Sequence, residues 1–312
     1  MYGVFERACA RQCAGLALMS LALTGCQDVG ILDNPQSVNP PIYVSIVIHN
    51  EETPDYIANE QRFQDERAAL IAFAEMLDLE NAMLNWQSDW TFLRAVQLYD
   101  DGSGTGGLNI VAYIASLGFE VDPHAHESQY SYADVAHLIG LCGVTPLGVA
   151  GGFIAYPPAD CLLEQFWSPI QGNMFPAQSW TAQILWGGGT ANHVNEESLW
   201  ASGIWRPQDN NSFMTHDDNA PLPHIGKFGN DWTDLDILIQ KQQDNQLDTS
   251  KLYTAVIFVR QGDLMGPNQL SDFQQSLHTR DANGNLEWVG LTEVYNIWQS
   301  NYGGVANQLS YP

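Results

Sequence analysis

Two short clusters of titratable residues hold the chemistry that this sequence could perform. The first is His49–Glu52 (His-Asn-Glu-Glu), and the second is Asp122–Glu127 (Asp-Pro-His-Ala-His-Glu). Side chains two residues apart in extended chain face the same side, so His124 and His126 can point at one centre. The first cluster repeats that spacing between a histidine and a glutamate. Two imidazoles and a carboxylate, with one position left for water, are typical of catalytic zinc and related metals.

A metal in such a site would lower the pKa of its water to about 7 and so supply a nucleophile at neutral pH. The proton of that water needs an acceptor. Glu127, Asp122 or the member of the His49/Glu51 pair that does not bind the metal could provide it. The alternative interpretation is a His-x-His pair in a loop that has no function.

Four further residues are weaker candidates for the same site. His193 lies in a Gly-rich loop, and His216 and His224 lie in a loop rich in Pro and Asn. Arg206 follows a short predicted strand, where its cation could clamp a carboxylate or an oxyanion. Each of the four also fits an ordinary loop residue. The Trp-rich stretch 167–205 favours either a platform for sugar rings or simple core packing.

Both clusters follow predicted strands, which would bring them together. The run 41–49 is apolar and β-branched, as in a strand buried on both faces of a parallel sheet. A second strand is predicted over 119–123, and a third over 253–259. In parallel α/β folds, ligands bind at the carboxyl ends of the strands. The two clusters therefore lie where a site is expected.

Helices are expected between the strands. Helical spacing of apolar residues predicts helices over 59–78, 90–99 and 132–141, among others. Strand and helix alternate without an internal repeat, which predicts an α/β fold with a parallel sheet. About seven or eight such units favour a (β/α) barrel of about seven or eight parallel strands, with a doubly wound open sheet as the alternative.

The N-terminus resembles the leader of a bacterial lipoprotein. The apolar run 13–25 follows Arg7 and Arg11 and falls short of the ~20 residues that span a bilayer. It ends in Leu-Thr-Gly-Cys26, which is similar to a lipobox. We therefore expect a signal peptide over 1–25, a lipid on Cys26 that anchors the chain at the cell envelope, a linker over 26–41 and one domain over 42–312. A plain signal peptide or a buried first helix is the alternative.

The net charge restricts the classes of binding partner, and the cysteine content bears on disulfide formation. The chain has 11 Lys and Arg against 36 Asp and Glu, a net charge of −25, so nucleic acid and anionic lipid are excluded as partners. Besides Cys26, the mature chain has Cys142 and Cys161. Outside the cytoplasm these two are expected to form a disulfide, and two buried thiols are the alternative.

The order of these features resembles the polysaccharide deacetylase superfamily, a group of metal-dependent carbohydrate esterases on a deformed (β/α) barrel. Leu117–His124 (LGFEVDPH) is similar to that family's Gly-His-Glu-Ile-Gly-Asn-His stretch, whose last histidine binds the metal. Family members carry a second histidine four residues later, where this chain has Ser128 and offers His126 instead. Trp205–Pro207 is similar to the family's arginine motif, and Val259–Gln261 replaces its final Leu-x-His.

The resemblance also implies roles for the first cluster. Ile48–Glu51 stands in the place of the family's Thr-Phe-Asp-Asp, in which one Asp is the base and the other binds the metal. Glu51 would then bind the metal with His124 and His126, and His49 would be the base.

The resemblance implies a metal-dependent hydrolase that removes acyl groups from a glycan, with zinc or another divalent ion as cofactor. Arg206 would steady the oxyanion. Two alternatives remain. One is a non-catalytic glycan-binding or scaffold lipoprotein on the same barrel. The other is a glycoside hydrolase, which needs two carboxylates across the sugar site.

Overall fold

A pair of parallel strands lies at the centre of the fold. β1 (Ile42–His49) and β10 (Tyr253–Arg260) pair over their whole length, from Ile42 opposite Tyr253 to His49 opposite Arg260. Every residue of β1 is buried, as its continuous apolar run predicted, because a strand covered on both faces needs no polar alternation. Burying each large aliphatic side chain contributes roughly 1.5–3 kcal/mol, so this strand is a major source of stability.

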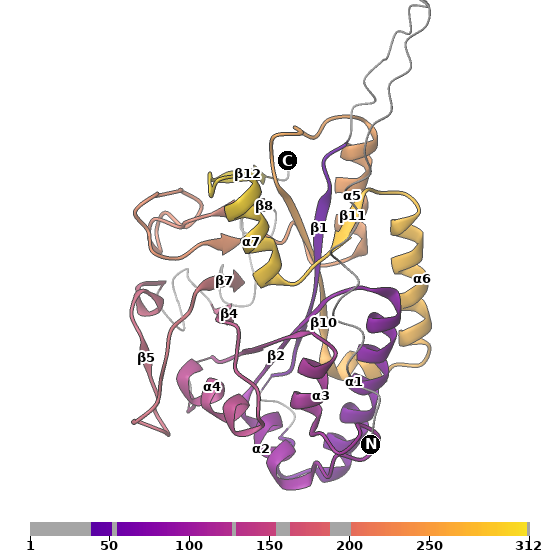
Figure 1. The fold of residues 1–312 in the computed structure, drawn as a ribbon, viewed down its shortest axis with the longest axis vertical. Coiled ribbons are helices and arrows are strands. Elements are labelled where there is room, and N and C mark those ends of the chain that lie inside the picture. Colours follow the sequence, from indigo (N-terminus) through magenta and orange to yellow (C-terminus); the bar gives the residue numbers. More distant parts are fainter. Residues whose placement is uncertain (1–38, 52–54, 127–128, 154–162, 188–200, 311–312) are drawn as a thin grey trace, which may run out of the picture. The chain divides into compact units, whose positions relative to one another are not determined.

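The computed structural model describes residues 39–51, 55–126, 129–153, 163–187 and 201–310 (Figure 1). Several expectations therefore lie outside the described residues. They are the signal peptide over 1–25, Cys26 with most of its linker, Glu127, Cys161 and His193.

The first sheet is wholly parallel and has the order β10-β1-β2-β3. β2 (Leu84–Ser88) pairs with the second half of β1 and with β3 (Glu120–Pro123), while β11 (Leu286–Trp288) pairs with the first half of β1. The carboxyl ends of β1, β2, β3 and β10 therefore meet at one edge of the sheet. The register places Gln87 of β2 opposite His49.

The second sheet is mixed and has the order β12-β8-β9-β7-β4. β4 (Val149–Phe153), β7 (Ile184–Gly187) and β9 (His224–Ile225) are parallel to one another. β8 (Ala201–Trp205) runs antiparallel to β9 and to β12 (Asn307–Ser310).

The two sheets approach each other on both sides without forming one closed ladder among the described residues. On one side, an isolated parallel bridge joins His124 to Gly151. On the other, Val256 N donates to Lys227 O at 2.9 Å, and Phe258 N donates to Asn230 O at 2.9 Å. The expected barrel of parallel strands is thus seen as a mixed α/β arrangement whose ladder is not closed. The register shift between Gly151 and Phe153 interrupts the pairing of β4 with β7 inside the second sheet.

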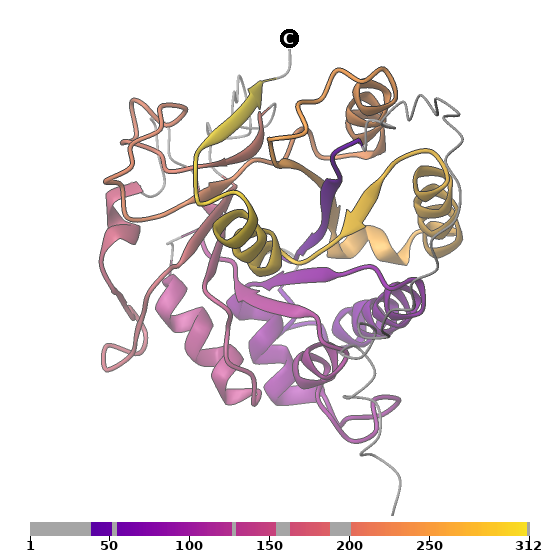
Figure 2. The ribbon, with the colours of Figure 1, turned by 45° about the horizontal axis from the view of Figure 1, so that its top comes forward.

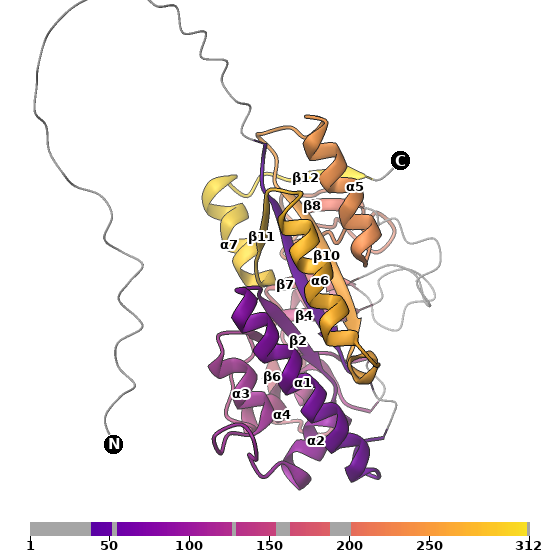
Figure 3. The ribbon, with the colours of Figure 1, turned by 90° about the vertical axis from the view of Figure 1, so that its right-hand side faces the viewer.

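Helices surround the strands (Figure 2). They are α1 (Glu60–Glu80), α2 (Trp90–Tyr99), α3 (Ile110–Ser116), α4 (Tyr132–Leu141), α5 (Trp232–Gln243), α6 (Gln269–Asp281) and α7 (Leu291–Asn301). The short elements are the hairpin of β5 (Ile170–Gln171) and β6 (Ser179–Trp180) and the 3-10 turns η1 (Leu163–Trp167) and η4 (Gln261–Met265). α1 and α6 pack side by side through the rings of Phe73 and Phe273, 4.8 Å apart (Figure 3).

Helices α2 and α4 have the bounds that their sequences predicted, because each begins at a side-chain cap. Asp89 accepts a hydrogen bond from Phe92 N at 3.0 Å and starts α2. Ser131 and Asp134 form a capping box at the start of α4. The Asp134 carboxylate also accepts backbone N–H groups from residues 173–175, so it joins α4 to the segment after β5.

Among the described residues, no helix is long and apolar enough to cross a membrane. Cys142, at the end of α4, is buried, and burial raises the pKa of its thiol to about 11. It forms no disulfide with a described residue, and its expected partner Cys161 lies outside them.

Candidate metal centre

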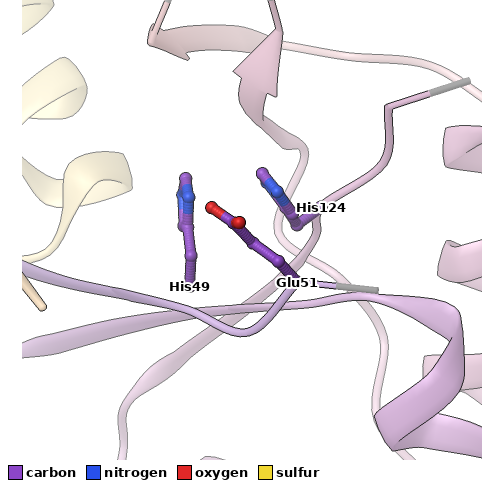
Figure 4. A group of neighbouring side chains, drawn as sticks. All are labelled: His49, Glu51 and His124. Atoms are coloured by element: carbon purple, nitrogen blue, oxygen red, sulfur yellow. The ribbon is translucent and has the colours of Figure 1, made fainter. Parts of the chain in front are cut away.

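His49, Glu51 and His124 come together at the carboxyl edge of the first sheet. His49 ends β1, Glu51 follows two residues later, and His124 directly follows β3. Each offers one ligand atom, and these atoms all lie within 4.8 Å of one another (Figure 4). The two histidines are buried and the glutamate is exposed. β1 and β3, on either side of β2 in the parallel sheet, thus bring together two clusters that are more than 70 residues apart in the sequence.

The ring of His49 is held by strand β2. His49 Nε2 lies 2.5 Å from Gln87 Oε1, and Gln87 Nε2 donates to Asn85 Oδ1 at 2.6 Å. Asn85 Nδ2 in turn donates to the carboxylates of Glu120 at 3.0 Å and Asp122 at 2.9 Å. These successive hydrogen bonds orient the side-chain amides of Asn85 and Gln87. The amide oxygen of Gln87 therefore faces His49 and would accept a hydrogen from Nε2 of the imidazole.

The carboxylates at the end of this chain are buried and lie behind the site. Burial, with a smaller contribution from the Glu120 charge, raises the pKa of Asp122 to about 8. Its Oδ1 accepts the backbone N–H groups of Gly148 and Val149 at 2.8 and 3.0 Å, which ties β3 to the start of β4. Asp122 was considered as a base from the sequence, but it does not line the cavity described below.

His124 is enclosed by its surroundings. It is 1% exposed, and its ring centroid lies 4.1 Å from that of His49. Burial, followed by the neighbouring His49 and His126, lowers the pKa of His124 well below 6.5, so the imidazole is neutral. Its Nδ1 has no hydrogen-bond partner among the described residues. A buried, neutral imidazole with an unpartnered nitrogen suits a metal ligand better than a structural hydrogen-bonding residue.

His126 lies beside this group without belonging to it. Its Nε2 is 3.1 Å from His124 Nε2, and the two rings meet edge to face. His126 is half-buried. The structure thus places His49, where the sequence suggested His126, in the group that could hold an ion.

These side chains line a cavity of about 290 Å³. Its walls include Trp186 and Phe258, whose rings stack with centroids 6.3 Å apart. The remaining lining residues are His49, Glu51, His124, His126, Gly152, Gly187, Lys227, Asn230, Arg260 and Asp263. A second cavity of about 210 Å³ shares His49, Glu51, Arg260 and Asp263 with the first.

Arg206, His216 and His224 are not among the described residues that line either cavity. The Arg206 guanidinium donates to the carbonyl oxygens of Ala220 and Pro221 at 3.2 and 2.9 Å. His216 accepts from the backbone N–H of Arg206 at 3.0 Å. His224 is buried, with Nε2 2.5 Å from Gly187 O.

Three residues that contribute to the site were missed from the sequence. Gln87 is the penultimate residue of β2, so it lies near a strand end, where the other site residues also lie. Arg260 likewise follows the predicted strand over 253–259. Lys227 lies in a loop between short elements, and no sequence pattern marked it.

The donor set fits a divalent transition metal. Two imidazoles and one carboxylate converge at a cavity, and Nδ1 of His124 is buried without a hydrogen bond to a described residue. The Gln87 contact to His49 also matches the hydrogen bond that fixes the tautomer of metal-binding histidines.

Comparison with known proteins gives a fold and no family name. No family model matches the chain, and no curated protein matches it. Among solved structures, it is similar to Puue allantoinase, with a TM-score of 0.50 and 10% identity over 90% of this chain and 99% of that one. It is also similar to a probable polysaccharide deacetylase from Pseudomonas aeruginosa PAO1, with a TM-score of 0.48 and 9% identity over 84% and 92%.

The likeness to the allantoinase confirms the α/β class with a parallel sheet. At this identity it shows the fold alone, and one fold hosts many activities. The function must therefore be argued from the site.

Proposed function

We propose that this chain is a zinc-dependent hydrolase that removes acyl groups from carbohydrate. The observation that carries the proposal is the convergence of ligand atoms from His49, Glu51 and His124 within 4.8 Å at a cavity wall. The similarity of Leu117–His124 to the deacetylase motif supports carbohydrate as the substrate class.

His49, Glu51 and His124 hold the ion in this proposal. When bound, a divalent ion supplies a Lewis acid that activates water and polarises an acyl carbonyl. The assignment exchanges the roles that the sequence suggested for His49 and His126. Its reason is that Gln87 holds His49 Nε2, while His126 contacts His124 from outside the group.

His126 is the proton carrier. Its Nε2 lies 3.1 Å from Nε2 of His124, a proposed ligand, and the side chain is at the cavity wall. It takes the proton that water loses as the water oxygen forms a bond to the acyl carbon. The same nitrogen then gives that proton to the sugar oxygen or nitrogen as the acyl bond breaks. The products are a carboxylic acid and a de-acylated sugar.

The walls of the cavity suit a sugar ring. Phe258 is half-buried beside the buried Trp186, and an aromatic ring at a cavity wall is a surface against which the C–H face of a sugar packs. His49 also meets both rings at 5.3 and 5.0 Å between centroids. A sugar on these rings would therefore lie next to the residues proposed to hold the ion.

The test measures zinc content and acetate release on the full chain and its His124→Ala variant. We expect about one equivalent of zinc, measured by elemental mass spectrometry, and release of acetate from acetylated oligosaccharides. The variant should lose both and keep its circular dichroism spectrum. His278→Ala, which removes an exposed histidine of α6 outside both cavities, is the matched control and should keep the zinc.

Two outcomes would contradict the proposal. A folded chain that holds no zinc after reconstitution, yet retains glycans, would support the non-catalytic glycan-binding alternative. Release of new reducing ends without acetate would instead support a glycoside hydrolase.

The proposed location is the cell envelope. The Leu-Thr-Gly-Cys26 sequence supports lipid attachment and tethering of the domain by the linker over 26–41. Mass spectrometry of the mature N-terminus tests this. A chain that starts at Cys26 with diacylglycerol would support it, and an unmodified Cys26 would exclude it.

A further inference from the structure

A second buried hydrogen-bond network reaches the candidate metal centre through Asn50. This residue lies between His49 and Glu51 in the sequence and is 2% exposed. It contributes to the wall of the second cavity and not to the wall of the cavity that His124 lines. An amide also cannot take a proton from water near neutral pH. Any effect of Asn50 on the site therefore passes through the two candidate ligands beside it.

Both ends of the Asn50 amide form hydrogen bonds. Oδ1 accepts from the backbone N–H of Asp89 at 2.7 Å, and Nδ2 donates to Ser88 Oγ at 3.0 Å and to Gln261 Oε1 at 3.2 Å. The backbone N–H of Asn50 donates to Gln87 O at 3.2 Å, so the bonding of this segment to β2 continues one residue beyond the end of β1. A buried side chain that is bonded at both ends is held in one orientation.

The buried carboxylate of Glu66 sets the orientation of Gln261. Gln261 begins η4, directly after β10, and is 1% exposed. Its Nε2 donates to Glu66 Oε2 at 3.1 Å. Glu66 is fully buried and forms an ion pair with Arg62, so it is ionised and only accepts hydrogen bonds. The amide nitrogen of Gln261 must therefore face Glu66. The amide oxygen then faces Asn50 and Trp86, whose Nε1 donates to it at 2.9 Å.

The position of Glu51 depends on the backbone that this network holds. Figure 4 shows the carboxylate of Glu51 between the rings of His49 and His124. Glu51 is exposed and has no hydrogen bond or ion pair with a described residue. His49 has a partner of its own in Gln87, whereas Glu51 is placed by the backbone that directly follows Asn50. A shift of that backbone would move the carboxylate away from the two imidazoles.

Packing alone does not require an amide at position 50. Burying an amide costs free energy unless its hydrogen bonds are made, and an apolar side chain of similar size would fill the same space without that cost. The bonds of Asn50 join the segment after β1 to the start of α2 and to η4, which lie far apart in the sequence. A fully bonded buried network specifies one arrangement of the segments that it joins.

We propose that Asn50 is a positioning residue of the metal centre. This inference rests on the proposed function, in which Glu51 binds the ion. Asn50 holds the backbone that presents Glu51, just as Gln87 holds the ring of His49. Gln261 and the groups behind it keep the Asn50 amide in the orientation that this requires. Two hydrogen-bond networks thus fix the two ligands at the end of β1 before the ion arrives, so binding needs little reorganisation.

The first experiment compares Asn50→Ala with a matched control, Asn210→Ala. Asn210 is also a buried asparagine that is bonded at both ends and lines neither cavity. Its Oδ1 accepts from Leu163 N at 2.8 Å, and its Nδ2 donates to Glu164 at 2.8 Å. Both variants should lower the urea midpoint of the metal-free protein, because each loses buried hydrogen bonds. Only Asn50→Ala should lower zinc affinity, by about 10–100-fold in competition with a chelator.

Cobalt(II) in place of zinc gives a readout that a loss of stability alone does not change. Its visible absorption depends on the number and geometry of its ligands. We expect Asn50→Ala to change the spectrum of the cobalt-loaded chain, because Glu51 is displaced, and Asn210→Ala to keep the wild-type spectrum. Gln261→Met removes the amide behind Asn50 without altering the segment that carries Glu51. It should change zinc affinity and the spectrum in the same direction, and it carries the test if Asn50→Ala does not fold.

The outcomes separate this inference from the proposed function. Wild-type zinc affinity and cobalt absorption in folded Asn50→Ala, or in Gln261→Met where only that variant folds, overturn the positioning role and leave the hydrolase intact. Equal losses of zinc affinity in Asn50→Ala and Asn210→Ala overturn the positioning role as well. A chain that shows the expected differences but releases no acetate overturns the hydrolase alone. A wild-type chain that binds no zinc overturns both.

Discussion

His49 Nε2 lies 2.5 Å from Gln87 Oε1, and the same two residues face each other in the ladder between β1 and β2. Backbone pairing and a side-chain hydrogen bond thus set the position of one imidazole together. The Gln87 side chain is itself enclosed, because any Cβ at Gly151 would overlap it. A ligand held in this way needs little reorganisation when an ion arrives.

Replacing Gln87 by Leu removes the hydrogen bond that fixes the His49 tautomer. We expect zinc affinity to fall about 10–100-fold, the usual effect of losing such a partner. Competition with a chelator measures it. Gln64→Leu changes an amide of α1 that bonds to the carbonyl of Tyr99 and should leave zinc affinity unchanged. Equal zinc affinity in wild type and Gln87→Leu would show that His49 does not bind the ion.

Replacing Gly152 by Ala should displace His124. Gly152 has φ +72°, and its added Cβ would overlap Cε1 and Nδ1 of the His124 ring. Gly106→Ala is the matched control, because Gly106 has φ +67° and open space around it. Both variants should lose roughly 1–2 kcal/mol in the free energy of unfolding from the left-handed backbone. Only Gly152→Ala should also lose zinc, and retention of zinc there would contradict the assigned position of His124.

The proposed proton carrier gives a prediction that separates binding from catalysis. His126→Ala should keep its zinc and lower kcat about 10²–10⁴-fold, as expected for loss of a general base. Elemental mass spectrometry and acetate release measure the two effects. Loss of zinc from His126→Ala would make His126 a ligand and return the assignment to the one that the sequence suggested.

Asp134 gives a prediction about stability and pH. Burial alone would raise the pKa of Asp134, but backbone N–H donors from Ser131 and residues 173–175 hold it below 3.8. A lowered carboxylate pKa stabilises the fold above the unfolded value and loses that effect as pH falls through the folded one. Asp134→Asn should therefore cost about 1–3 kcal/mol at pH 7, and the difference should shrink only below pH 3.8.

Urea denaturation at several pH values measures this difference. Asp272→Asn removes one exposed carboxylate near the start of α6 and serves as the control for charge alone. A cost for Asp134→Asn that is the same at pH 7 and pH 3 would show that the lost interactions do not depend on ionisation.

Local patterns were sufficient to predict much of the fold. The apolar runs of β1 and β10 identified buried parallel strands, and the segments of α2 and α4 have caps at their first turns. β9 spans only His224–Ile225 and was missed, because a strand of that length has no periodicity. The antiparallel direction of β8 depends on its partners β9 and β12, which lie far from it in the sequence.

The sequence predicted that both clusters lie at one site, and which residues bind an ion there stays a prediction. Strand ends located both clusters, so His49, Glu51, His124 and His126 were found to line one cavity. The two-residue spacing favoured His124 and His126 as a pair of metal ligands. The register of β1 with β2, however, places Gln87 opposite His49, and Gln87 hydrogen-bonds that imidazole. That register is a tertiary property. A position after a strand is also not sufficient to place a residue in the site. Arg206 follows β8 but does not line the cavity.

The single bridge between His124 and Gly151 gives the site a further property. β3 and β4 meet through this bridge, at the residue proposed to bind the ion, so the centre lies on the joint between two sheets. An ion held by His49, Glu51 and His124 would join the ends of β1 and β3, two strands of the first sheet, next to the point where the second sheet meets it. The residence time of the ion would then report how often these two strand ends move apart.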